Sequence, residues 1–132
     1  MKNAELKINN KDLRLIDVND ENMVLIGHFY DKFTSFSIEE TFGSDVVELR
    51  DLHGELEITE DFNKWRNRVV DENNIKVVVP TREMTGEGGK WITRYYVSLR
   101  DAKAIAMMTM NDAGTLARSF FILASKLSIP NL

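Results

Sequence analysis

The stretch GGKWITRYYVSLRDAKAIAMMTMNDAGTLARSFFI, residues 88–122, decides the fold of this chain. It begins with a segment of β-type residues. This segment ends at Ser98, which together with Asp101 forms the S-x-x-D variant of a capping box. Apolar residues then recur at helical spacing and predict one buried stripe, made of Leu99, Ala102, Ile105 and Ala106. Asn111 and Asp112 offer a second N-cap. A second apolar face follows, made of Leu116, Phe120, Leu123 and Leu127. The stretch therefore predicts a strand and two helices joined by a tight corner, at which Gly114 allows a close helix–helix approach.

The residues before this stretch predict a helix pair and a β-hairpin. A short strand at 46–48 precedes a helix whose apolar residues are Leu49, Leu52 and Leu56. Thr59 is predicted to cap a second helix with a buried stripe of Phe62, Trp65 and Val69. Two β-rich segments, 75–79 ending at Pro80 and 91–97, flank a charged, glycine-rich loop and predict a long hairpin. We therefore predict an α+β fold with a helix-turn-helix-like pair, a hairpin wing and a C-terminal helix pair.

The first 45 residues are predicted to form a small α/β segment. A turn at 19–22 is expected to lead into a strand at 23–26. Phe29, Phe33 and Phe36 follow at helical spacing, and residues 43–45 are predicted to be a loop. We accordingly divide the chain into an acidic segment, 1–45, and a second region, 46–132.

Composition limits the classes of protein to which this chain can belong. With 132 residues and no cysteine, it is expected to form one domain without disulfides or thiolate metal sites. The net charge of −4 lies in the first third, because residues 1–45 contain five Lys/Arg and nine Asp/Glu, whereas the rest contains twelve of each. This balance argues mildly against nucleic acid as the main partner. Because no signal peptide or membrane-length apolar segment is evident, we expect a cytoplasmic protein.

The sequence does not predict an active site or a cofactor site. It lacks a nucleophile elbow, and its paired carboxylates are neighbours in sequence that point apart on a helix. Neither His28 nor His53 has further metal ligands at suitable spacing. We instead expect His53 to fix a helix turn or to pack beside Trp65. The sequence therefore favours a protein that is not an enzyme and binds no metal or cofactor.

Residues 46–122 resemble the AntA/AntB antirepressor family of bacteriophages and prophages. The resemblance rests on VVELRDLHGEL (46–56), FNKW (62–65), the glycines at 88–89, YYVSLRDAKAIAMM (95–108), Gly114, and ARSFFI (117–122). It implies a protein that binds a phage repressor, or a related regulator, by protein–protein contacts and relieves repression, which shifts the prophage toward lytic growth. It also implies kinship with phage and viral domains whose helix-plus-hairpin modules are candidates for contacting DNA.

Exposed hairpin tips, arginine and tryptophan are typical of protein-binding surfaces, and they define our candidate site. The candidate partner-binding residues are Arg66, Arg68, Arg82, Glu87, Lys90 and Trp91. In the alternative, a winged-helix-like DNA-binding regulator, the DNA-binding residues are Lys64, Arg66, Arg68, Arg82, Lys90 and Arg94. The competing structural interpretation is that these cations pair with nearby carboxylates, namely Glu55, Glu57, Glu60, Glu83 and Glu87. A third hypothesis takes the acidic first third as a nucleic-acid mimic.

The second predicted surface is a methionine cluster. Met107, Met108 and Met110 end one helix, and methionine suits both core gaps and adaptable interfaces. Consecutive residues cannot face one core together, so one of them is a candidate for the interface of a homodimer. Arg118, on a largely apolar helix, is predicted to form an ion pair with Asp101 or Asp112.

Overall fold

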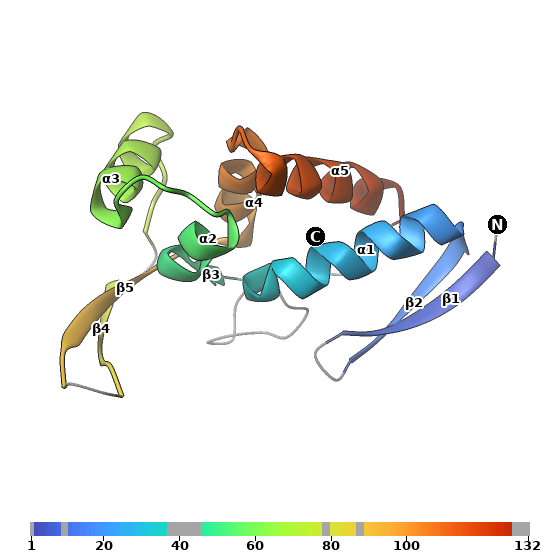
Figure 1. Cartoon of the computed structure of the whole chain (residues 1–132), viewed down its shortest axis with the longest axis horizontal. Helices are drawn as coiled ribbons and strands as arrows, with labels where there is room; N and C mark the ends of the chain where they lie inside the picture. Colours follow the sequence, from blue (N-terminus) through green and yellow to red (C-terminus); the bar gives the residue numbers. More distant parts are fainter. Residues whose placement is uncertain (1, 9–10, 37–45, 78–79, 87–88, 128–132) are drawn as a thin grey trace.

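The computed structural model describes residues 2–8, 11–36, 46–77, 80–86 and 89–127, and its fold is α+β (Figure 1). The elements of the N-terminal third are β1 (Lys2–Ile8), β2 (Lys11–Val18), α1 (Asp20–Lys32) and a short 3-10 helix, η1 (Thr34–Phe36). The following elements are β3 (Val46–Glu48), α2 (Leu49–Glu55), α3 (Phe62–Glu72), β4 (Pro80–Met84), β5 (Trp91–Ser98), α4 (Leu99–Met108) and α5 (Asp112–Leu127). The predicted helix pair, hairpin and C-terminal helix pair are therefore confirmed.

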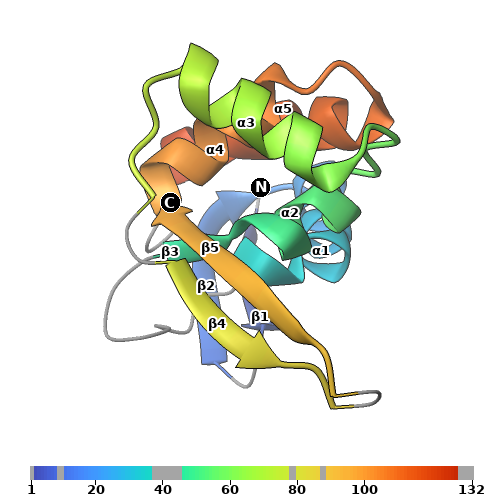
Figure 2. The same ribbon diagram turned by 90° about the vertical axis from the view of Figure 1, so that its left-hand side faces the viewer.

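The strands form two separate antiparallel sheets. β1 pairs with β2, whereas the other three strands form a sheet in the order β3–β5–β4. β3 pairs with the end of β5, where Val46 lies opposite Ser98. β4 pairs with its beginning, where Met84 lies opposite Trp91. The β4–β5 hairpin consequently extends away from the helices, as Figure 2 shows.

Side-chain caps fix where the helices begin. The Ser98 hydroxyl accepts the Asp101 N–H at 3.1 Å, and the Asn111 side chain accepts the Gly114 N–H at 2.8 Å, as predicted. The cap of α3 is Asp61, which accepts two N–H groups of the first turn, and the prediction of Thr59 was wrong. An acidic cap two residues nearer the helix also interacts better with its dipole.

The corner between α4 and α5 requires a glycine at position 114. A Cβ atom there would lie 1.8 Å from the main-chain oxygen of Thr109. The close approach predicted for Gly114 is therefore confirmed. Arg118 closes the same corner, since its guanidinium donates to the carbonyls of Met107 and Thr109 at 2.8 and 2.9 Å. Carbonyls at the end of α4, rather than the predicted carboxylates, thus hold this arginine.

The N-terminal third shares its core with the rest of the chain. α1 lies alongside α5 (Figure 1), and the rings of Phe29 and Phe120 stack with centroids 3.8 Å apart. Phe33, Phe36 and Phe121 belong to the same buried cluster. Stacked aromatic rings of this size contribute much of the apolar area in such a core. The division of the chain at residue 45 stays a prediction, and an experiment that tests it must disrupt these aromatic contacts.

Three local predictions differ from the structure. Residues 23–26 belong to α1 rather than to a strand, because Asn19 caps a helix whose first turn contains two acidic residues. The second hairpin segment begins at Pro80, and residues 75–77 form no strand. The buried stripe of α5 consists of Ala113, Ala117, Phe120, Phe121 and Ala124. Leu116 and Leu123 are partly buried beside this stripe. The side chain of Leu127 and the predicted loop at 43–45 lie outside the described residues.

Candidate functional site

The β4–β5 hairpin has two chemically different faces. Opposed residues of an antiparallel pair project from the same side, and successive residues alternate between sides. One side, which we call the aromatic face, contains the opposed pairs Pro80–Tyr95, Arg82–Thr93 and Met84–Trp91. The other, which we call the acidic face, contains Thr81–Arg94 and Glu83–Ile92.

Cation–π contacts join the aromatic face to the helix pair. The guanidinium of Arg66, on α3, lies 4.2 Å from the centre of the Tyr95 ring. Arg50, on α2, lies 4.3 Å from the centre of the Phe62 ring, and its Nε donates to the carbonyl of Thr93 at 2.9 Å. The rings of Phe62 and Tyr95 are themselves 6.2 Å apart. The four side chains form a continuous cation–aromatic stack that fixes the hairpin against α3.

The same face becomes more exposed toward the hairpin tip. Trp91 is 55% exposed, Met84 across from it is 51% exposed, and the Arg82 guanidinium lies 5.4 Å from the centre of the Trp91 ring. Lys90, next to Trp91, is also exposed. A large exposed ring beside a pre-positioned arginine is the composition that anchors protein–protein interfaces.

The arginine of the acidic face, Arg94, forms ion pairs with carboxylates of the same chain. Arg94 bonds to Glu48 at 3.0 Å, to Glu83 at 3.0 Å and to Asp51 at 3.5 Å. Partial burial lowers the pKa of Arg94, but the hydrogen bonds to Glu83 and Glu48 outweigh this and raise it above its usual value. Desolvation, with the nearby charge of Glu48, raises the pKa of Asp51. Three carboxylates around one cation leave this face with a negative charge.

One known protein family matches the part of the chain that contains these elements. Residues 47–111 match the family described as AntA/AntB antirepressor. This segment is therefore similar to an AntA/AntB antirepressor domain. It runs from β3 to the cap of α5 and so contains α2, α3, both faces of the hairpin and α4. No curated protein and no solved structure matches the chain.

The matched segment brings only some of the predicted site residues together. Arg66, Arg82 and Trp91 lie on or beside the aromatic face, and Lys90 directly precedes Trp91 in the chain. Arg68 lies on another flank of α3, where the hydrogen bond to Glu60 at 2.7 Å raises its pKa above the usual value. Glu87 lies outside the described residues.

The competing interpretation, that carboxylates neutralise the cations, holds for two of them. Arg68 and Arg94 are paired, whereas Arg66 and Arg82 lie over aromatic rings. Lys64 is exposed and forms no ion pair with another described residue. Of the carboxylates named as partners, Glu55 instead binds Thr34 and Ser35, and Glu57 binds Lys32.

Sequence reasoning missed three of the four side chains of the cation–aromatic stack. Arg50, Phe62 and Tyr95 were not predicted as site residues, although the alternation along β5 places Tyr95 on the same side as Trp91. Arg50 had no local signal, because it meets Phe62 only after α2 and α3 pack. The prediction for His53 is confirmed, since its Nε2 lies 2.8 Å from the carbonyl of Glu60 and its ring 5.1 Å from Trp65.

The methionine cluster divides between the core and the surface. Met107 packs against the hydrophobic core, whereas Met108 is 44% and Met110 is 88% exposed. Within the described segments, no helix is long and apolar enough to cross a membrane. In the same part of the chain, no group of three or more His, Cys, Asp or Glu could hold a metal ion.

Proposed function

We propose that this chain is a non-catalytic antirepressor that binds a phage repressor or related regulator in the bacterial cytoplasm and relieves repression. The family of residues 47–111 supports antirepression in general. The observation that favours one surface is the aromatic face, where Arg82 and Trp91 are exposed beside each other at the hairpin.

The aromatic face suits a protein partner for two physical reasons. Trp91 and Met84 offer apolar area that a partner can bury at about 25 cal/mol per Å². Arg82 already lies over its ring, so little side-chain freedom is lost when a partner binds. The stack around Tyr95 attaches the inner end of this face to α3.

The test begins with tagged protein and lysate from a lysogenic host, treated with nuclease and washed at raised salt. A captured repressor is then purified, and its affinity is measured for Arg82→Ala and Trp91→Ala. We expect each variant to bind at least about tenfold more weakly, the loss typical of interface anchors. Arg100→Ala, an exposed cation on α4, is the matched control and is expected to stay near the wild-type affinity. Unchanged affinity in both hairpin variants would refute the site assignment.

The second candidate function, DNA binding, is favoured by the topology. The order β3–α2–α3–β4–β5, with the sheet order β3–β5–β4, is that of a winged helix, in which α3 would enter the major groove and the hairpin would be the wing. Two of the six predicted cations, Arg68 and Arg94, are neutralised by ion pairs. DNA binding predicts an affinity that falls steeply with salt, and Lys64→Ala would reduce that slope. A salt-resistant protein complex supports the first proposal instead.

A further inference from the structure

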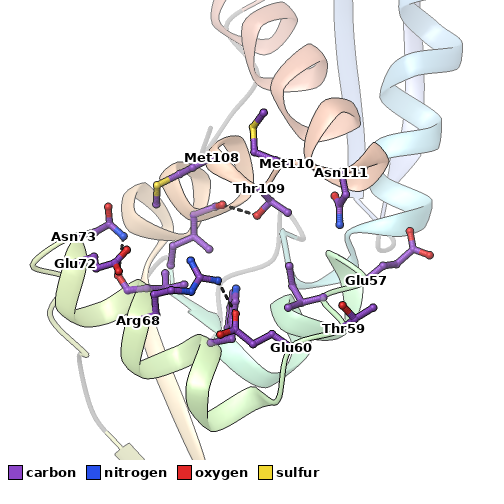
Figure 3. Close-up of a pocket in the computed structure, with 14 residues that line it drawn as sticks. Glu57, Thr59, Glu60, Arg68, Glu72, Asn73, Met108, Thr109, Met110 and Asn111 are labelled. Atoms are coloured by element: carbon purple, nitrogen blue, oxygen red, sulfur yellow. Dashed lines mark hydrogen bonds and ion pairs between the residues drawn. The ribbon is translucent and has the colours of Figure 1, made fainter.

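A groove lies on the flank of α3 that faces away from the hairpin. It is a cavity of about 590 Å³ between α3 and the corner that joins α4 to α5, with a loop before α3 closing one end. Figure 3 shows Arg68, Glu72 and Asn73 on the α3 side, with Met108 and Thr109 on the other. Its volume is within the range of sites that hold a ligand or a peptide side-chain cluster.

The floor of the groove is apolar and its mouth exposes two methionines. Trp65, Val69 and Ile105 form the buried floor. Met108 and Met110 lie at the mouth, where Met108 is partly and Met110 largely exposed. Methionine adapts its shape to varied apolar partners, so this mouth can accept leucine-sized side chains without a fixed outline.

The rim of the groove is acidic. Its charged residues are Glu57, Glu60, Glu72 and Arg68. Glu60 holds Arg68 at 2.7 Å, and Lys32 of α1 binds Glu57 at 2.8 Å from outside the groove. Glu72 forms no ion pair with another described residue. The polar neighbours are satisfied too, because Asn73 and Asn111 donate to the carbonyls of Val69 and Leu56. The charge of Glu72 also helps to raise the pKa of Arg68. The three carboxylates nevertheless outnumber Arg68 and Lys32 by one, so the rim keeps a net negative charge, and Glu72 is its carboxylate without an ion pair to a described residue.

We propose that this groove binds a lysine- or arginine-bearing amphipathic segment of a protein partner. Its apolar side chains would cover Met108, Met110 and the edge of the floor, and its cations would face Glu72. A second copy of this chain fits poorly, because a two-fold interface centred here would bring Glu72 toward its own symmetry mate. The negative charge of Glu72 also repels the phosphates of nucleic acid. The groove is thus a docking site distinct from the aromatic face.

A repressor contains segments of this chemistry, since proteins neutralise DNA phosphates with Lys and Arg. The identification of the occupant as such a segment rests on the proposed function. The preference of the groove for a cationic, apolar segment does not, so it is tested without any repressor.

The test uses the fluorescence of Trp65. The chain contains two tryptophans, so Trp91→Phe leaves Trp65, which lines the groove, as the only one. The probe is a short peptide of leucine and lysine at helical spacing, and the control peptide replaces lysine with glutamate. We expect the lysine peptide to shift the Trp65 emission in a saturable manner and the glutamate peptide to leave it unchanged.

Matched variants separate specific binding from general charge attraction. Glu72→Lys is expected to weaken the lysine peptide about tenfold, through loss of attraction and new repulsion. Asp71→Lys makes the same charge change one residue away on an exposed position that does not line the groove, and we expect an affinity close to that of the parent. Met110→Ala, which keeps all charges, is expected to weaken the peptide severalfold.

Three outcomes would overturn the proposal. They are no binding of the lysine peptide, equal losses in Glu72→Lys and Asp71→Lys, or equal binding of the two peptides. Sedimentation of the unliganded chain tests the other occupant. A dimer that Met110→Ala dissociates would assign the groove to a second copy and would also contradict the proposal. None of these results depends on whether the aromatic face binds a repressor.

Discussion

Replacing Glu48 should disrupt the junction that orients the hairpin. Glu48 is 5% exposed and lies where β3 ends and α2 begins. Its carboxylate accepts the N–H groups of Arg50 and Asp51 at 3.0 and 3.1 Å, and that of Tyr95 at 3.0 Å. It also accepts a hydrogen bond from the Arg94 guanidinium at 3.0 Å. One side chain thus caps a helix, binds the central strand and neutralises a cation.

The expected cost follows from these four bonds. Loss of an N-cap costs about 1 kcal/mol. A main-chain N–H left unpaired in a buried position costs about 1–3 kcal/mol more, and here Tyr95 would lose its partner. We therefore expect Glu48→Ala to lower the free energy of unfolding by about 3 kcal/mol. Glu48→Gln keeps one acceptor oxygen but turns an NH₂ group toward other donors, so about 1–2 kcal/mol is expected.

Urea denaturation, followed by circular dichroism, measures both variants. For a domain of this size, 3 kcal/mol corresponds to a decrease in melting temperature of roughly 10 °C. Asp71→Asn, an exposed carboxylate on α3, is the control and should change stability by less than about 0.5 kcal/mol. If Glu48→Gln were as stable as this control, the four hydrogen bonds would not hold the junction and our account of the hairpin's orientation would fail.

Three further perturbations test other parts of the fold. Gly114→Ala should destabilise by about 3 kcal/mol through the clash at the α4–α5 corner. Gly27→Ala, with open space around its Cβ position on α1, should be neutral or stabilising, and urea denaturation of both variants measures the difference. Burial raises the pKa of Glu55 above 4.5 despite opposing hydrogen bonds, so the folded protein holds this proton more tightly than the unfolded chain. The contribution of Glu55 to stability therefore falls as pH rises above about 4.5. Glu55→Gln should flatten that fall, as measured by urea titrations at about pH 4.5 and 7. Phe29→Ala should cost about 3–5 kcal/mol in one cooperative transition, and a separate transition of the first 45 residues would instead support their independence.

Much of the fold was predictable because its signals are local. The caps at Ser98 and Asn111 need only residues three positions apart. The hairpin followed from two β-rich segments around a glycine-rich loop. Such patterns are encoded within one element, so they survive without knowledge of the packing.

The remaining features depend on contacts between distant segments. The apolar residues 23–26 suit either a strand or a helix when the sequence is considered alone. The helix is the form that buries Ile26 and Phe29 against the rest of the core. The stack of Arg50 on Phe62 and Arg66 on Tyr95 joins three elements that no sequence pattern aligns. The groove depends on how far α3 lies from the α4–α5 corner, which is a tertiary quantity.

Helical periodicity explains how α3 can belong to two surfaces at once. Phe62 and Arg66 are four residues apart and project toward β5, whereas Arg68 and Glu72, also four apart, project toward the groove. The buried Trp65 lies between the two flanks. No residue is shared, so the effects of mutations on the two surfaces should be independent.

For a partner that binds both surfaces, this separation predicts how the effects of two mutations on binding combine. The losses of binding free energy in Trp91→Ala and Glu72→Lys should add in the double variant to within about 0.5 kcal/mol. A partner that uses only the hairpin should be insensitive to Glu72→Lys alone. A coupling much larger than this would mean that the flanks of α3 respond to each other, and that aromatic face and groove are one site.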